Sequence, residues 1–274
     1  MKDYTITVLG CGVMGNAVVS AILSASFEPY PSKIICCTNS EKLSQALEKK
    51  LKHDIVEFSY GIESNKSAVS KAHIVVLGFK PYMLHTVYEQ VKEVLTGEQL
   101  IISLLAGTSL EELTIFSPYV AKVMTNTPAQ FGCGTAAISF TEKAEEKYRD
   151  LVIKLTDPLG LALQIPEKNM DAATSLIGSG PAFYLLMMEA MIDGGIRMGF
   201  PYATAKEAAA KVMEGTAKMV LETGEHPAAL RSKICTPGGT TIGGLLKMED
   251  AGLRSAIARG VEEAANISAS FKKK

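Results

Sequence analysis

The chain has 274 residues, a length typical of one large domain or two modest ones. Hydrophobic residues make up 47% and charged residues 21%, which is ordinary for a globular protein and excludes extensive disorder. The formal net charge is −1, so no basic surplus exists for nucleic-acid phosphates or anionic lipid, and we expect neither kind of partner. No apolar run reaches the roughly 20 residues that span a bilayer.

The five cysteines indicate a reducing compartment. Their number is odd and they form no C-x-x-C pair, so the sequence predicts neither a disulfide framework nor a metal site. The chain enters a strand-like segment directly after its first four residues, which leaves no room for a targeting peptide. We therefore expect a soluble, cytoplasmic protein.

The first 166 residues alternate short apolar runs with helical patterns. The runs typical of buried strands are 5–9, 33–37, 74–77 and 100–105, with 120–123 and 136–140 extending the sheet. Helical periodicity is found at 14–25, 41–51 and 82–95. This alternation predicts an α/β fold with a doubly wound, Rossmann-type sheet.

The composition changes after Pro166. From residue 171 onward no segment is convincing as a strand, and helical patterns cover 182–198, 202–223 and 254–271. We therefore predict a dinucleotide-binding domain over residues 1–166 and an all-helical domain over residues 167–274. Residues 182–191 (AFYLLMMEAM) are apolar nearly all round, which requires burial on every side. A second subunit would provide that burial; a central helix within one bundle is the alternative.

A glycine-rich motif follows the first predicted strand and opens the first predicted helix. It is G-x-G-x-x-G, made of Gly10, Cys11, Gly12, Val13, Met14 and Gly15. In that context the first glycine permits the turn, the second lets the backbone approach a pyrophosphate, and the third allows close helix–strand packing. The alternative is a glycine-rich turn without a ligand.

The end of the second strand bears on the choice of dinucleotide. Thr38, Asn39 and Ser40 stand where an NAD site has a carboxylate for the ribose hydroxyls. Hydroxyl and amide groups can donate to a 2′-phosphate, so the pattern favours NADP; these residues could also merely cap the next helix. Other candidates for the same crevice follow later strands: Gly78, Phe79, Lys80, Pro81, Ala106 and Asn126.

A second cluster of small and hydroxyl residues lies at 234–245 (ICTPGGTTIGGL). A Pro-Gly-Gly turn leads into a helical pattern, so free N–H groups and threonine hydroxyls gather at a helix N-terminus, which is suited to a small carboxylate. The alternative is an ordinary turn between helices with threonine caps. The candidate substrate-binding residues are Thr236, Gly238, Gly239, Thr240 and Thr241.

These motifs together resemble the pyrroline-5-carboxylate reductase family. The resemblance rests on residues 5–15 (TITVLGCGVMG), 78–81 (GFKP), 124–128 (MTNTP), 178–181 (GSGP) and 227–249 (PAALRSKICTPGGTTIGGLLKME), and covers essentially the whole chain. The first of these blocks is most similar to the fungal members. Thr236 replaces a common serine, and Thr240 replaces a small residue. Where some members have a glutamate, this chain has Gly224, so Glu222 or Glu225 would have to take over any role of that glutamate.

The resemblance implies NAD(P)H-dependent reduction of 1-pyrroline-5-carboxylate to L-proline, the last step of proline synthesis. It implies NADPH as the cofactor with NADH possible, an interlocked homodimer through the helical domain, and in some members a decamer. It adds Asn65 to the residues near the 2′-phosphate and matches Thr241 to the substrate-loop threonine, whose hydroxyl would orient the imine nitrogen. No other side chain is placed as a general acid.

Two alternatives remain. The first is an NADP-dependent β-hydroxyacid dehydrogenase, although such enzymes carry a lysine early in the long helix and residues 181–191 contain none. The second is a non-catalytic NADP sensor, which would not need the second cluster.

Overall fold

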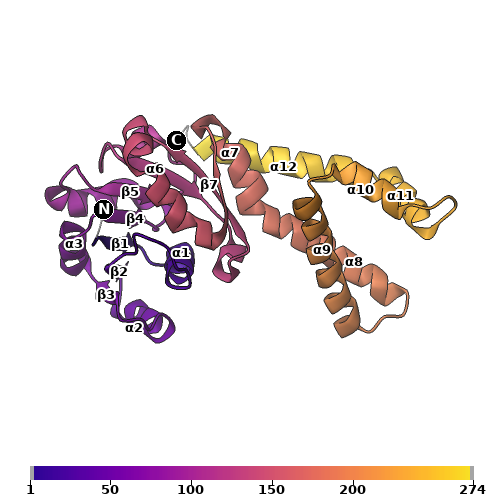
Figure 1. The fold of residues 1–274 in the computed structure, drawn as a ribbon, viewed down its shortest axis with the longest axis horizontal. Helices are drawn as coiled ribbons and strands as arrows, with labels where there is room; N and C mark the ends of the chain where they lie inside the picture. The colour runs from indigo at the N-terminus through magenta and orange to yellow at the C-terminus, as the bar shows by residue number, and fades with distance from the viewer. Residues whose placement is uncertain (1–2, 272–274) are drawn as a thin grey trace. The chain divides into compact units, whose positions relative to one another are not determined.

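The computed structural model describes residues 3–271 (Figure 1). These residues form two compact units. The first unit consists of two segments of the chain, one that ends at Ser179 and one that begins at Glu263, and the second unit is Gly180–Glu262. The boundary expected after residue 166 remains a prediction.

The first unit is built on one eight-stranded sheet. Its strands are β1 (Thr5–Leu9), β2 (Lys33–Thr38), β3 (Val56–Tyr60), β4 (Ile74–Leu77), β5 (Leu100–Ser103), β6 (Val120–Met124), β7 (Gly134–Phe140) and β8 (Gly160–Gln164). Their order is β3-β2-β1-β4-β5-β6-β7-β8. The first six run parallel, and β7 turns antiparallel to β6. The predicted Rossmann-type sheet is confirmed, and its strand order reverses between β1 and β4.

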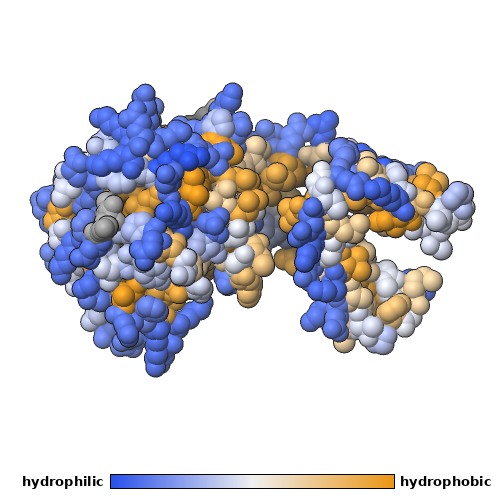
Figure 2. All heavy atoms as spheres, viewed as in Figure 1, coloured by the Kyte–Doolittle hydropathy of each residue, from blue (hydrophilic) through white to orange (hydrophobic). Residues whose placement is uncertain are grey.

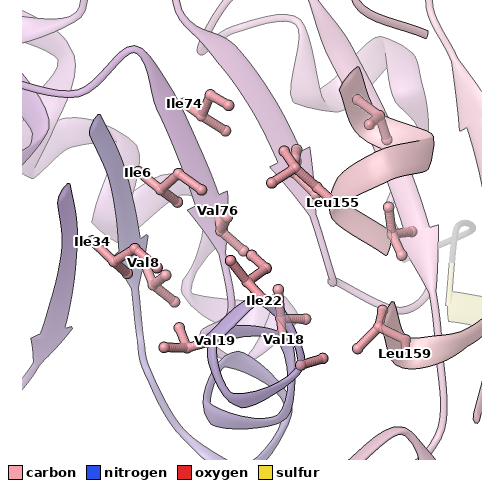
Figure 3. Close-up of a cluster of buried hydrophobic side chains, with 14 of the residues drawn as sticks. Ile6, Val8, Val18, Val19, Ile22, Ile34, Ile74, Val76, Leu155 and Leu159 are labelled. Atoms are coloured by element: carbon pink, nitrogen blue, oxygen red, sulfur yellow. The ribbon is translucent and has the colours of Figure 1, made fainter. Parts of the chain in front are cut away.

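Helices cover both faces of this sheet. On one face lie α1 (Val13–Leu23), α2 (Glu41–Lys50) and α6 (Glu142–Thr156); on the other lie α3 (Ile62–Ser70), α4 (Leu84–Val91) and α5 (Leu110–Leu113). Figure 3 shows how the first layer closes: Val18, Val19 and Ile22 of α1 point toward strand residues such as Ile6 and Val76. Because helices pack on both faces, the continuous apolar strands are buried between two hydrophobic layers.

Several elements were not among the sequence predictions. These are β3, β8, α3, α5, α6, α7 and α10. Two of them, β3 and β8, are the edge strands of the sheet, and in both most residues are partly or fully exposed. An edge strand buries less side chain, so it lacks the continuous apolar run that identified the inner strands.

The second unit contains helices only. They are α8 (Gly180–Arg197), α9 (Tyr202–Thr223), α10 (Pro227–Ile234), α11 (Thr240–Asp250) and α12 (Leu253–Ser270), the last of which ends in the first unit. Its core is small: Ile192 of α8 packs with Ala205 and Ala209 of α9. As expected, the described residues after 171 include no strand.

The apolar segment at 182–191 is exposed in the single chain. Tyr184, Leu185, Leu186 and Met191 each expose more than half of their surface. Figure 2 shows hydrophobic residues at the surface of the second unit, around α8 and α11. The alternative of a central helix within one bundle is therefore wrong, because the chain alone does not cover this helix.

One helix also corrects an expectation about apolar length. Residues Glu167–Arg197 form a single stretch in which α7 (Met170–Ala173) and a π-helical turn at Thr174–Ser179 lead into α8. By length and composition this helix could cross a membrane, with a mean hydropathy of 1.3 in its most apolar window. The glycines and proline at 178–181 do not end it, since the π-turn continues the helix through them. An apolar helix that packs against a second subunit passes the same test, so this is weak evidence for a membrane span.

Candidate active site

Two turns meet back to back where the strand order of the sheet reverses. Gly10, which follows β1, has φ +80°, and a Cβ placed on it would lie 2.7 Å from the backbone N of Phe79. A Cβ on Gly78, which follows β4, would lie 2.8 Å from the carbonyl O of Gly10. Both positions therefore require glycine. In such sheets this reversal point, beyond the carboxyl ends of the strands, is where ligands bind.

The first turn of α1 is open toward that crevice. Gly12 is the N-cap, no side chain caps the helix, and a Cβ on Gly12 would meet no atom within 4 Å. Val13 is 75% exposed. Gly15 faces inward instead, since its Cβ would lie 3.0 Å from Cγ1 of Val8. An uncapped helix N-terminus with glycine at the approach is a cradle for a pyrophosphate, so the motif fits a dinucleotide.

The end of β2 is tied to this turn. The amides of Gly10 and Cys11 donate to the carbonyl O of Cys37 at 3.1 and 2.9 Å. Burial raises the pKa of the Cys37 thiol to about 12. A hydrogen bond with Cys11, followed by burial, raises the pKa of the Cys36 thiol. These two thiols are therefore protonated at neutral pH and add no negative charge beside the phosphate cradle.

The residues expected near a 2′-phosphate lie together just beyond β2. Asn39 is exposed, and Ser40 occupies the N-cap of α2 without a side-chain cap bond. The Asn65 amide donates to the carbonyl O of Thr38 at 2.9 Å, and its oxygen accepts from Ser59 Oγ at 3.0 Å. Asn65 therefore braces this strand end. The hydroxyl cap that was the alternative for Ser40 is not formed.

The remaining first-unit candidates follow β4, β5 and β6. Lys80 is exposed and is the N-cap of a 3-10 turn that begins at Pro81. Ala106 follows β5 and packs against the buried cluster of Met124, Ala137, Met170 and Ala173. The Asn126 side chain accepts from the amide of Thr135 at 3.2 Å. All therefore stand at the carboxyl edge of the parallel strands, as the turn residues at Gly10–Gly15 do.

Two buried oxygens near these elements were not among the sequence candidates. Asn16 Oδ1, on α1, and Thr125 Oγ1, directly after β6, have no hydrogen-bond partner within residues 3–271. Buried polar groups are almost always paired, so polar atoms of a ligand would satisfy them. The available signal was a polar residue one position after the glycine motif and another directly after a fully buried strand. In the same residues, no group of three or more His, Cys, Asp or Glu side chains is arranged to hold a metal ion.

The second cluster forms a turn at a helix N-terminus in the second unit. Gly239 N donates to the carbonyl O of Thr236 at 3.0 Å, and Gly238, with φ +67°, provides the third position of a Pro-Gly type II turn. A Cβ on Gly239 would collide with Thr236 Oγ1. Gly239 is the N-cap of α11, and no side chain caps that helix.

The threonine-cap alternative is therefore wrong, because Thr240 and Thr241 are the first two residues of α11 rather than its cap. Thr241 is half-buried and Thr240 is exposed. The first-turn N–H groups of α11 lie beside these two hydroxyls, an arrangement that can hold a carboxylate and donate one further hydrogen bond.

The comparisons with known proteins agree along the whole chain. A family model described as pyrroline-5-carboxylate reductase dimerisation matches residues 167–271, and one described as NADP oxidoreductase coenzyme F420-dependent matches residues 5–107. The chain is 44% identical to the pyrroline-5-carboxylate reductase of Kluyveromyces lactis over 98% of both chains, and 37% identical to that of Schizosaccharomyces pombe over 94% of this chain and 95% of the other. The reductase structure from Streptococcus pyogenes superposes with a TM-score of 0.84 at 27% identity, over 98% and 99% of the two chains. This chain is a member of the pyrroline-5-carboxylate reductase family, similar to its fungal members.

Proposed function

We propose that this protein reduces 1-pyrroline-5-carboxylate to L-proline with NADPH, the last step of proline biosynthesis. The observation that carries the proposal is the uncapped N-terminus of α11, set directly after the type II turn and flanked by two threonine hydroxyls. In a chain of this family that arrangement suits a small cyclic imine with one carboxylate. The open phosphate cradle at α1 provides for the other reactant.

NADPH held at Gly10–Gly15 would supply a hydride to the imine carbon, which would leave the C=N electron pair on the nitrogen, where a proton would bind. The Thr241 hydroxyl donates a hydrogen bond to the imine nitrogen and orients it, while the first-turn N–H groups of α11 bind the carboxylate. Solvent supplies the proton. Catalysis by this chain then rests on positioning and on fixed hydrogen-bond donors.

NADPH is the preferred cofactor in this proposal, and NADH is accepted more weakly. The support is chemical: Thr38, Asn39 and Ser40 offer hydroxyl and amide groups, and none of them carries a carboxylate that would repel a 2′-phosphate. The match of residues 5–107 to an NADP oxidoreductase model points the same way.

The same proposal covers assembly and location. Residues 1–166 bind the dinucleotide, and residues 167–274 bind the substrate and form a homodimer, with a decamer as a further assembly. The exposed apolar side chains of α8 support the dimer. The protein acts in the cytoplasm, without a membrane or nucleic-acid partner.

One assay separates the proposal from its alternatives. NADPH oxidation is followed with 1-pyrroline-5-carboxylate, and L-proline is identified as the product; NADP reduction is followed with a 3-hydroxyisobutyrate-type substrate. We expect turnover in the first reaction only. Turnover in the second alone would indicate a β-hydroxyacid dehydrogenase, and NADPH binding without either turnover would indicate a sensor.

A further inference from the structure

The loop that joins β5 to α5, residues 104–109, is held from several sides. Lys122 of β6, only 2% exposed, donates from Nζ to the carbonyl O of Thr108 at 2.5 Å. Glu167 accepts from the amide of Leu110 at 2.6 Å, where α5 begins. Ala106 packs against the buried cluster that includes Met170. A surface loop ordinarily needs few such contacts, so this one is fixed in a particular conformation.

Phe271, the last residue that the structure describes, reaches the same loop. Gly107 has φ +72°, and a Cβ placed on it would lie 2.9 Å from Cβ and 3.3 Å from Cδ2 of Phe271. Phe271 therefore lies directly against the Gly107 backbone. Ser268, 2% exposed, donates to Asp171 Oδ1 at 2.9 Å and fixes the last turn of α12. Figure 1 shows the last turn of α12 close to α7, which carries Asp171.

Burial alone does not account for Phe271. Its side chain is 57% exposed, so it removes little apolar surface from water. What it does is occupy the one side of Gly107 on which a side chain would otherwise stand. A glycine with positive φ has wide conformational freedom, and the ring restricts that freedom.

We propose that Phe271 is a positioning residue for the cofactor. It holds Ala106 and Gly107 in the conformation that receives the nicotinamide half of NADPH. The location follows from the general rule for such sheets: with the adenosine half toward β2, the other half would extend over the ends of β4 and β5. The inference rests on the proposed function. A loop that is already ordered spares the cofactor the entropic cost of ordering it, so losing the ring weakens NADPH affinity first.

The test replaces Phe271 with alanine in the full-length protein. We expect the NADPH KM and the NADPH dissociation constant, measured by fluorescence quenching, to rise by about three- to tenfold. The KM for 1-pyrroline-5-carboxylate at saturating NADPH stays within about twofold of wild type. Phe271→Leu keeps apolar bulk on Gly107 and restores most of the affinity. The control is a protein that lacks residues 272–274 but keeps Phe271, in which both constants match wild type.

An unchanged NADPH affinity in Phe271→Ala would overturn the inference, as would an equal rise in both KM values with a fall in melting temperature. The binding measurement needs no turnover. A wild-type protein that binds NADPH but does not reduce 1-pyrroline-5-carboxylate would therefore remove the proposed function and leave this inference testable.

A double-mutant cycle shows whether Phe271 acts through Gly107. In the wild-type background, Gly107→Ala introduces backbone strain and also displaces the Phe271 ring. In the Phe271→Ala background there is no ring to displace, so the same substitution adds only the backbone strain. The combined rise in the NADPH dissociation constant should therefore be smaller than the product of the two single effects. Effects that simply multiply would show that the ring acts elsewhere, and the inference would fail.

Discussion

Thr241 is the residue on which the proposed chemistry depends most. It is the second residue of α11, and the cap position belongs to Gly239. Its hydroxyl therefore does not cap the N-terminus of this helix. A donor held at a helix N-terminus without a structural task is available to a ligand.

Replacing Thr241 with valine keeps the shape and removes the donor. A hydrogen bond to a charged group contributes about 1.5–3 kcal/mol, so kcat/KM for 1-pyrroline-5-carboxylate should fall roughly 10- to 100-fold. The NADPH KM should stay unchanged. Thr216→Val, on an exposed turn of α9, is the matched control and should retain full activity. Near-normal kcat/KM in Thr241→Val would move the substrate contact to Thr236 or Thr240.

Asn39 allows a similar test of cofactor choice. It is exposed beyond β2, beside the strand end that Asn65 braces. Asn39→Asp places a carboxylate where the 2′-phosphate is expected, so NADPH binding should weaken about tenfold or more while NADH binding holds or improves. Isothermal titration with both cofactors measures this. Asn39→Ala separates loss of the amide from gain of charge, and should weaken NADPH without favouring NADH.

At the scale of elements, the predictability of the strands followed their burial. The inner strands β1, β4 and β5 are continuous apolar runs and were predicted within two residues. The edge strand β3 (VEFSY) is partly exposed throughout, so its pattern did not stand out. Helix α6 was missed although its buried residues, at positions 144, 148, 152 and 155, recur at helical spacing. Charged residues around that stripe concealed it.

The candidate site was predictable where its chemistry is local. In the glycine motif and the Pro-Gly-Gly turn, the residue types themselves determine the backbone conformation, and both were found from sequence. Contacts between distant segments were not predictable: the approach of Phe271 to Gly107 leaves no pattern along the chain.

In the two glycine turns at the strand reversal, alanine substitutions should impair different properties: folding stability at Gly78 and NADPH affinity at Gly12. Gly78→Ala forces a Cβ against the Gly10 carbonyl, 2.8 Å away, and should cost about 1–3 kcal/mol of folding free energy. Gly12→Ala meets no atom of the protein, so its melting temperature should match wild type while NADPH affinity falls, because the new methyl group occupies the pyrophosphate approach. Thermal unfolding gives the melting temperature of each variant, and cofactor titration gives its NADPH dissociation constant. A stable Gly78→Ala protein would contradict the packing argument.

At the scale of the whole molecule, the second unit is incomplete in one chain. The side chains of α8 that should form a core face outward, and the buried cluster in this unit consists of a few alanine and aliphatic residues. The match of residues 167–271 to a dimerisation model supports a second copy as the cover.

Charges on α8 should therefore disrupt assembly. Leu185→Glu/Leu186→Glu alters two side chains that are 61% and 67% exposed, so a lone chain would tolerate it, whereas an apolar interface would not. We expect wild type to elute at micromolar concentration as a dimer or a multiple of it, and the variant to be monomeric and inactive. Leu43→Glu, 52% exposed on α2, is the control and should not change the mass by light scattering. A folded, active wild-type monomer would remove this idea.

The return of α12 to the first unit also governs how the protein can be made. The cofactor-binding unit is discontinuous: it starts at the N-terminus, is interrupted by Gly180–Glu262, and is completed by residues from Glu263 onward. On the ribosome, the sheet emerges early, yet the turn that anchors Ser268 on Asp171 is synthesised last. The nascent sheet must therefore wait for the entire helical insertion before Phe271 can pack on Gly107, and a fragment ending at Ser179 would lack both this contact and the Ser268–Asp171 hydrogen bond.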